Sequence, residues 1–99
     1  MEKYIDYEER AALLKALAHP VRLRIVHSLL TGGCHNVGCM EKSSGMSQSC
    51  VSQHLQKLRA AGVVMAERSG NEVYYHAASR EVAALMAALF EEETEQYVL

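Results

Sequence analysis

Three cysteines are the residues of this 99-residue chain whose chemistry is most distinctive. Cys34 and Cys39 stand five positions apart, and Cys50 follows further along the chain. One bend of the backbone would bring Cys34 and Cys39 within the roughly 4.4–6.8 Å between Cα atoms that a disulfide requires. The same two thiolates could instead bind a soft metal ion. A third interpretation, that all three are small buried residues without a sensing role, also stays open.

The cysteine count and the start of the sequence bear on the compartment. An odd number of cysteines, with no apolar signal region at the N-terminus, makes a structural disulfide framework improbable and predicts a cytoplasmic location. No apolar run approaches the roughly 18 residues of a membrane span, so we expect no membrane partner. The sequence also lacks a Cys-x-x-Cys motif, a phosphate-binding glycine loop and a nucleophile with its base, so we do not expect an enzyme.

The cysteines fall near the starts of two predicted helices. Asn36 is a suitable N-cap for a short helix that ends near Gly45, which makes Cys39 its third residue. Ser47 is a suitable N-cap for the next helix, which makes Cys50 its third residue. Unpaired backbone amides and the helix dipole stabilise a thiolate at that position, so both cysteines are candidates for reactive thiols.

The remaining elements follow from helix caps, proline and glycine positions and a change of hydrophobic period. Together they predict one mainly α domain over residues 1–99 with a β-hairpin, in the order α-α-α-α-β-β-α. Two short strands cannot form a core of their own, so we expect the hairpin to pack on the helices. The other expected elements are a helix that begins after Asp6, a helix from Pro20 to Gly32, strands at 63–68 and 72–76 around a turn at 69–71, and a last helix capped by Ser79.

The helix that follows Ser47 has an unusual outer side. Its apolar positions lie on one side, and the other side carries the short or amide side chains of Ser49, Ser52, Gln53 and Gln56. From position 48 to 59 the sequence contains no acidic residue. Glutamine can pair with the major-groove edge of adenine, whereas serine and lysine suit base edges and phosphates. The pattern favours a DNA-reading helix over the simpler interpretation of an uncharged, solvated helix face.

The net charge of the whole chain, taken alone, argues against binding to nucleic acid. Ten Lys and Arg against twelve Asp and Glu give −2, but residues 81–99 contain five Glu and no Lys or Arg. Taking those five negative charges from the total of −2 leaves +3 for the rest of the chain. A basic body with an acidic end is compatible with binding to DNA.

Four segments together resemble the arsenic-repressor (ArsR/SmtB) family of transcriptional regulators. They are residues 17–25, 46–55, 58–64 and 68–76, and the resemblance extends over about residues 8 to 90. It implies a homodimeric winged helix-turn-helix repressor that pairs through its first and last helices and leaves double-stranded operator DNA when an inducer binds. On that basis the apolar stripe Leu85, Met86, Leu89 and Phe90 is expected to contact the second subunit, with the acidic end nearby.

The resemblance also assigns DNA contacts. It implies that the recognition helix enters the major groove and that the wing touches the adjacent backbone or minor groove. The predicted DNA-binding residues are Gln48, Ser49, Ser52, Gln53, Gln56 and Lys57 on the helix, with Arg68 and Asn71 on the wing.

The inducer sites known in this family do not transfer directly. Its Cys-x-Cys pair would fall on Asn36 and Gly38, and its last-helix metal site would fall on Ser79, Glu81, Glu92 and Glu95, which lack imidazole. We therefore predict a repressor that requires no cofactor and responds to an oxidant or reactive sulfur at Cys34 and Cys39, with Cys50 a weaker candidate. The alternative is a response to arsenite or a soft metal ion through the same pair, Cys34 and Cys39.

Overall fold

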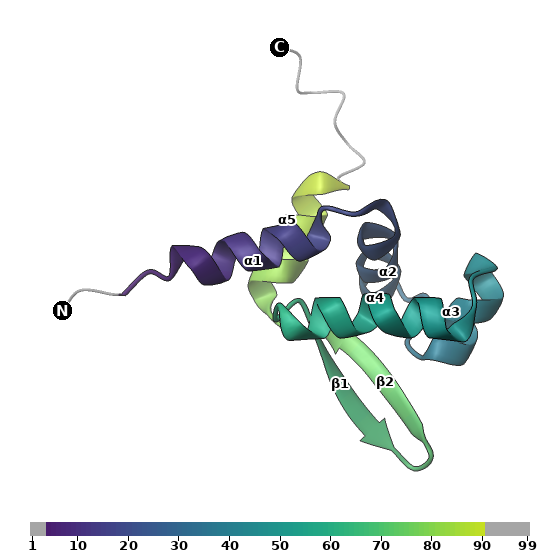
Figure 1. The fold of residues 1–99 in the computed structure, drawn as a ribbon. Coiled ribbons are helices and arrows are strands. Elements are labelled where there is room, and N and C mark those ends of the chain that lie inside the picture. The colour runs from purple at the N-terminus through teal and green to yellow at the C-terminus, as the bar shows by residue number, and fades with distance from the viewer. Residues whose placement is uncertain (1–3, 91–99) are drawn as a thin grey trace.

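A computed structural model describes residues 4–90 of the chain. Within that range the elements follow the order α-α-α-α-β-β-α (Figure 1), which confirms the predicted fold class. They are α1 (Tyr7–Leu17), α2 (Pro20–Leu30), α3 (Val37–Ser44), α4 (Gln48–Ala60), β1 (Val64–Ser69), β2 (Glu72–Ala77) and α5 (Arg80–Leu89).

The helices begin where their capping residues stand. The side-chain oxygens of Asp6, Asn36, Ser47 and Ser79 each accept a hydrogen bond from the backbone amide three residues later. These bonds satisfy amides that have no partner inside the helix, and each cap typically contributes about 1 kcal/mol. Pro20 occupies the first position of α2, where its missing N–H costs nothing. The predicted helix starts are therefore confirmed.

The hairpin differs slightly from its predicted bounds. Val64 pairs with Ala77 at the base, and Ser69 pairs with Glu72 at the tip, so the turn contains two residues, Gly70 and Asn71, rather than three. Gly70 has φ 65°, a left-handed conformation that glycine adopts without steric cost. Ser69 and Ala77 thus extend the strands one residue beyond their predicted ends, whereas Val63, the predicted first residue, lies just before β1.

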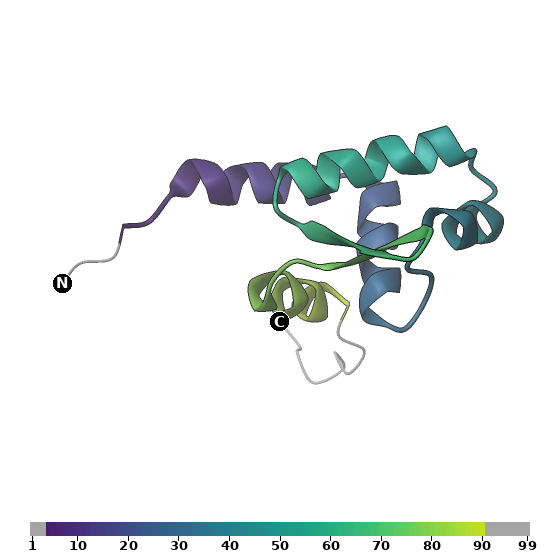
Figure 2. The same ribbon diagram turned by 90° about the horizontal axis from the view of Figure 1, so that it is seen from below.

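The core lies where α2, α4, the base of the hairpin and α5 meet. Seen from below (Figure 2), α4 lies along one side of the molecule and α5 along the other, with α2 and the hairpin between them. The buried residues are Ala16, Leu17, Ile25, Val26, Leu29, Met40, Val51, Leu55, Leu58, Val63, Val64, Val82 and Met86. Among the described helices, none is long and apolar enough to cross a membrane.

The two terminal helices leave apolar side chains uncovered. In α1 only Ala16 and Leu17 are buried, and the N-terminal part of the helix projects from the body in both ribbon views. Leu89, the last residue of α5, and Phe90, which follows it, are exposed, but Met86 is buried inside the subunit. The prediction that Met86 contacts a second subunit is therefore wrong, because it faces the same side as Val82. Residues 91–99, which hold most of the acidic end, lie outside the described part.

Candidate nucleic-acid interface and thiol pair

The outer side of α4 gathers the five predicted base-reading residues on one surface. They line a single open hollow: Gln48, Ser49, Ser52, Gln53 and Gln56. Four of them are exposed and Ser52 is half-buried. The opposite side of the helix is anchored by Val51, Leu55 and Leu58, which have no exposed surface. The helix therefore presents uncharged donors and acceptors on a face whose orientation is set by the core.

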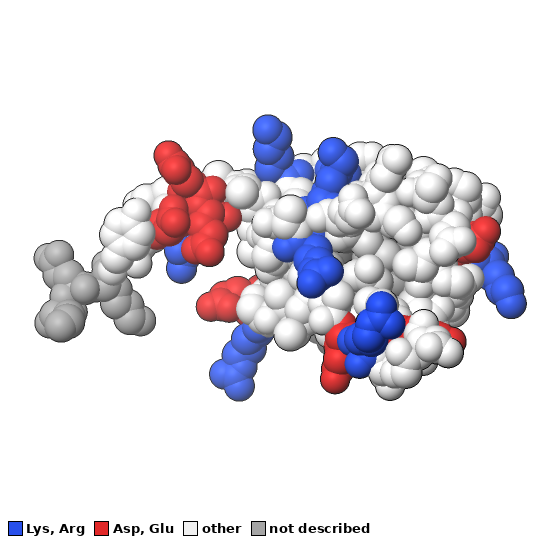
Figure 3. All heavy atoms as spheres, turned by 60° about the horizontal axis from the view of Figure 1, so that its bottom comes forward, with Lys and Arg blue, Asp and Glu red and all other residues white. Residues whose placement is uncertain are grey.

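The predicted phosphate contacts lie at the edges of this surface. Lys57 is exposed in the last turn of α4, Arg68 is exposed on β1, and Asn71 is exposed in the hairpin turn. Figure 3 shows basic side chains that project from this side of the molecule, with a broad uncharged area between them. Acidic side chains gather at the start of α1, whose first turn contains Glu8 and Glu9, and a few others lie beside basic side chains elsewhere on this face.

A histidine on α4 connects this helix to α2. The Nη1 atom of Arg22 lies 3.3 Å from Nδ1 of His54, and its Nε donates to the carbonyl of Ala16 at 2.6 Å. The rings of His19 and His54 lie 4.8 Å apart. Burial lowers the pKa of His54, and the neighbouring charges of His19, Arg22 and Lys57 lower it further. His54 therefore packs and forms a hydrogen bond within the fold.

Cys34 and Cys39 are joined by a disulfide within the chain, with Cα atoms 5.4 Å apart. Cys34 is half-buried and packs against the core, whereas Cys39 is exposed at the third position of α3. The backbone amide of Cys39 donates to Oδ1 of Asn36 at 2.8 Å. The residues between 4 and 90 contain no group of three or more His, Cys, Asp or Glu side chains arranged to hold a metal ion.

Cys50 stands apart from this pair. It is free and half-buried at the third position of α4, where its amide donates to the Ser47 hydroxyl at 3.2 Å. The cross-linked helix α3 and the recognition helix α4 are separated only by residues 45–47. Gly45 ends α3 at φ 77°, and its amide donates to the carbonyl of Glu41 at 3.1 Å. A movement of α3 would therefore reach α4 through only three connecting residues.

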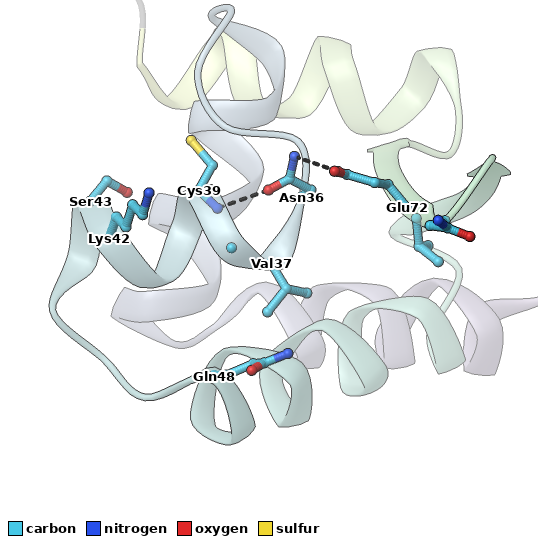
Figure 4. A pocket seen from close by; sticks show the side chains of 10 residues that line it. Asn36, Val37, Cys39, Lys42, Ser43, Gln48 and Glu72 are labelled. Carbon is cyan, nitrogen blue, oxygen red and sulfur yellow. Dashed lines mark hydrogen bonds between the residues drawn. The ribbon is translucent and has the colours of Figure 1, made fainter.

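A larger hollow of about 850 Å³ lies between α3, the start of α4 and the wing. Figure 4 shows Asn36 at its centre, pointing toward Glu72 on β2, with Gln48 below and Lys42 on the side of α3. Nδ2 of Asn36 donates to Oε1 of Glu72 at 3.3 Å. Sequence reasoning identified Asn36 as a cap but not this contact, because no spacing signal connects residues 36 positions apart.

The chain is similar to known regulatory proteins in sequence and in fold. The model of the family described as bacterial regulatory protein, arsR family, matches residues 19–66. The transcriptional repressor PagR of Bacillus anthracis is 38% identical over 88% of this chain and 87% of its own sequence. Its crystal structure covers 88% of this chain and 99% of that chain, with a TM-score of 0.79.

Two further solved structures are similar. Reduced HlyU from Vibrio cholerae is 34% identical, with a TM-score of 0.75 over 86% of this chain and 92% of that one. The homodimeric winged helix-turn-helix DNA-binding domain of Mb0332 from Mycobacterium bovis is 33% identical, with a TM-score of 0.77 over 90% of this chain and 86% of that one. Both proteins are therefore similar to this chain in sequence as well as in fold.

The histidine on α4 predicts a pH dependence of stability. Because the pKa of His54 is lowered in the folded state, the unfolded chain takes up this proton first as the pH falls through about 6.5. The His54 contribution to the free energy of unfolding is therefore complete above that pH and declines below it. We expect the thermal midpoint to fall between about pH 7.5 and about pH 5.5, and to fall less in His54→Gln, at constant protein concentration. An equal fall in both proteins would contradict this account.

Proposed function

The chain belongs to the arsR family of bacterial regulatory proteins, a family of transcriptional regulators and not of enzymes, and from this we propose a specific role. It is a homodimeric repressor that releases operator DNA when Cys34 and Cys39 are oxidised to a disulfide. The observation that carries the proposal is the placement of that disulfide at the start of α3, where it joins Cys39 of the helix to Cys34 before it. Only residues 45–47 separate α3 from the recognition helix. The similarity to PagR, a transcriptional repressor, supports the direction of the regulation.

The DNA-binding part of the proposal rests on α4 and the wing. The serine and glutamine side chains on the outer face of α4 enter the major groove, where Gln53 can form two hydrogen bonds to an adenine. Arg68 and Asn71 contact the neighbouring backbone or minor groove, and Lys57 contacts a phosphate. The absence of acidic residues from position 48 to 59 supports this arrangement, since no carboxylate on α4 opposes the phosphates.

The dimeric part rests on the uncovered apolar surface of the terminal helices. Tyr7 is 75% exposed, Leu14 53% and Leu89 59%, which is unusual for large apolar side chains unless a partner covers them. A second copy of the chain is the occupant we propose, and the homodimeric state of the similar Mb0332 domain supports it. Two recognition helices related by a two-fold axis would read half-sites about 34–36 Å apart.

The sensing part is a two-electron oxidation. With a peroxide as oxidant, one cysteine thiolate attacks a peroxide oxygen, the O–O bond breaks, and water leaves as a sulfenic acid forms. The second thiolate displaces the sulfenic oxygen as a second water, so that two thiols and hydrogen peroxide give one disulfide and two waters. The simplest polysulfide, hydrogen disulfide, would balance in the same way, with two molecules of hydrogen sulfide as products. HlyU, whose similar structure is of the reduced protein, supports thiol state as a variable in this family.

Gln53→Ala tests the recognition surface. Loss of a bidentate contact costs about 1–3 kcal/mol at each half-site, so operator affinity should fall while affinity for unrelated DNA stays unchanged. The measurement is fluorescence anisotropy with the DNA upstream of its own gene and with a scrambled duplex. Sedimentation should show the same oligomeric state as the wild type. Equal loss on both duplexes would contradict a base-reading role for Gln53.

Arg68→Ala tests the wing, with Arg80→Ala as the matched control. Arg80 is exposed on α5, on the other side of the molecule from α4. A lost phosphate contact reduces the slope of log affinity against log salt by about 0.9, or about 1.8 for a dimer. We expect this decrease for Arg68→Ala and none for Arg80→Ala. Identical slopes in the two variants would place the wing away from DNA.

The sensor is tested by the Cys34→Ser, Cys39→Ser double variant, with Cys50→Ser as its control. Peroxide should consume two of the three thiols in the wild type and weaken operator binding. Cys50→Ser should respond like the wild type, and the double variant should not respond. A double variant that still releases DNA would contradict the proposal. Release by arsenite, reversed by a competing dithiol and not reproduced by peroxide, would favour the soft-metal alternative at the same thiols.

A further inference from the structure

The segment enclosed by the disulfide touches the wing at two consecutive residues. The carbonyl of His35 accepts a hydrogen bond from the backbone amide of Tyr75 on β2 at 2.8 Å. The next residue, Asn36, donates to Glu72 on the same strand at 3.3 Å. Both contacts start inside the loop from Cys34 to Cys39 that the disulfide closes. The cross-linked loop is thus attached to the wing as well as to α3.

Asn36 makes its two contacts with one planar amide. Its Oδ1 accepts from the backbone amide of Cys39, and its Nδ2 donates to the Glu72 carboxylate (Figure 4). Because both atoms belong to one rigid plane, the direction of the cap toward Cys39 also sets the direction of the donor toward Glu72. Asn36 therefore couples the backbone position of Cys39 to the side chain of Glu72 on the wing.

The far end of this contact lies beside the proposed DNA contacts. Glu72 pairs with Ser69 across the hairpin tip and follows Asn71 directly. Asn71 and Glu72 line the same hollow as Gln48, the first residue of the recognition helix. A bond from Asn36 to Glu72 therefore restrains the wing tip at the place where the wing and the recognition helix face each other.

We propose that Asn36 is a positioning residue that transmits the thiol state of Cys34 and Cys39 to the wing through Glu72. This inference rests on the proposed thiol-responsive function. In the disulfide form the closed loop holds Asn36, and Asn36 holds Glu72 and the wing tip against the N-terminus of α3. That restraint prevents the wing from following the DNA and contributes to release of the operator.

Reduction removes the restraint. A dithiol such as dithiothreitol supplies two electrons and two protons, the S–S bond breaks, two cysteine thiols form, and the reductant becomes its cyclic disulfide. The backbone around Asn36 is then no longer held in a closed loop. The wing tip gains freedom to settle against the operator.

Asn36→Ser separates capping from coupling. Serine is an equally good N-cap, but it has no amide donor and is too short to reach Glu72. We expect unchanged thiol titration and unchanged operator affinity in the reduced form. The oxidised form should bind more tightly than oxidised wild type, so that the ratio between the two forms shrinks by about threefold to tenfold, the effect of one exposed hydrogen bond of ordinary net strength.

Variants of wing carboxylates provide the controls. Glu72→Ala should reduce the ratio as Asn36→Ser does, and it tests the same bond from an exposed position if Asn36→Ser folds poorly. Glu72→Gln keeps an acceptor and should retain most of the wild-type ratio. Glu67→Ala removes a different exposed wing carboxylate, which pairs with His76, and should leave the ratio unchanged.

The outcomes distinguish a failure of the thiol-responsive function from a failure of the coupling through Asn36 and Glu72. Equal affinities of reduced and oxidised wild type would overturn the thiol-responsive function and this inference with it. A clear difference in the wild type that persists at full size in Asn36→Ser and Glu72→Ala would overturn the inference alone. An equal decrease of the ratio in Glu67→Ala would also overturn it, because the effect would then be one of wing charge.

Discussion

The burial of one side of α4 is the constraint on which the rest of the structure depends. Val51, Leu55 and Leu58 have no exposed surface, and each fully buried aliphatic side chain contributes about 1.5–3 kcal/mol. Their packing sets the rotation of the helix, and the rotation decides that Ser52 and Gln53 face outward. The bond between Arg22 and His54 adds a polar tie between α2 and α4. A recognition surface of flexible polar side chains is thus carried on a rigid support.

The same support connects the cysteine pair to the two elements that we propose to contact DNA. The disulfide lies at the entry of α3, and α3 is joined to α4 by residues 45–47 and to the wing through the loop that carries Asn36. Both elements that we propose to contact DNA are therefore connected to the loop that the disulfide closes, although neither carries Cys34 or Cys39. Helices that pack against a dense core move as units, so a change at the loop is passed on as a change of position.

Local signals in the sequence predicted a large part of this arrangement. Caps such as Asn36 and Ser47 act within one helical turn, so the helix starts could be predicted from neighbouring residues. The five-residue spacing of Cys34 and Cys39 likewise allowed a disulfide to be anticipated. Contacts between distant segments could not be predicted, because they depend on how the helices pack. Examples are the bond from Asn36 to Glu72 and the inward direction of Met86, which shares its helix with the exposed Leu89.

The central claim is that the disulfide weakens the hold of α4 and the wing on DNA. Its most direct test is the operator affinity of the wild-type protein prepared entirely as the dithiol and entirely as the disulfide, at one salt concentration. The account predicts weaker binding by the disulfide form, within the range of about 5–150-fold that is typical of coupling between two sites. Equal affinities, or tighter binding by the disulfide form, would contradict it.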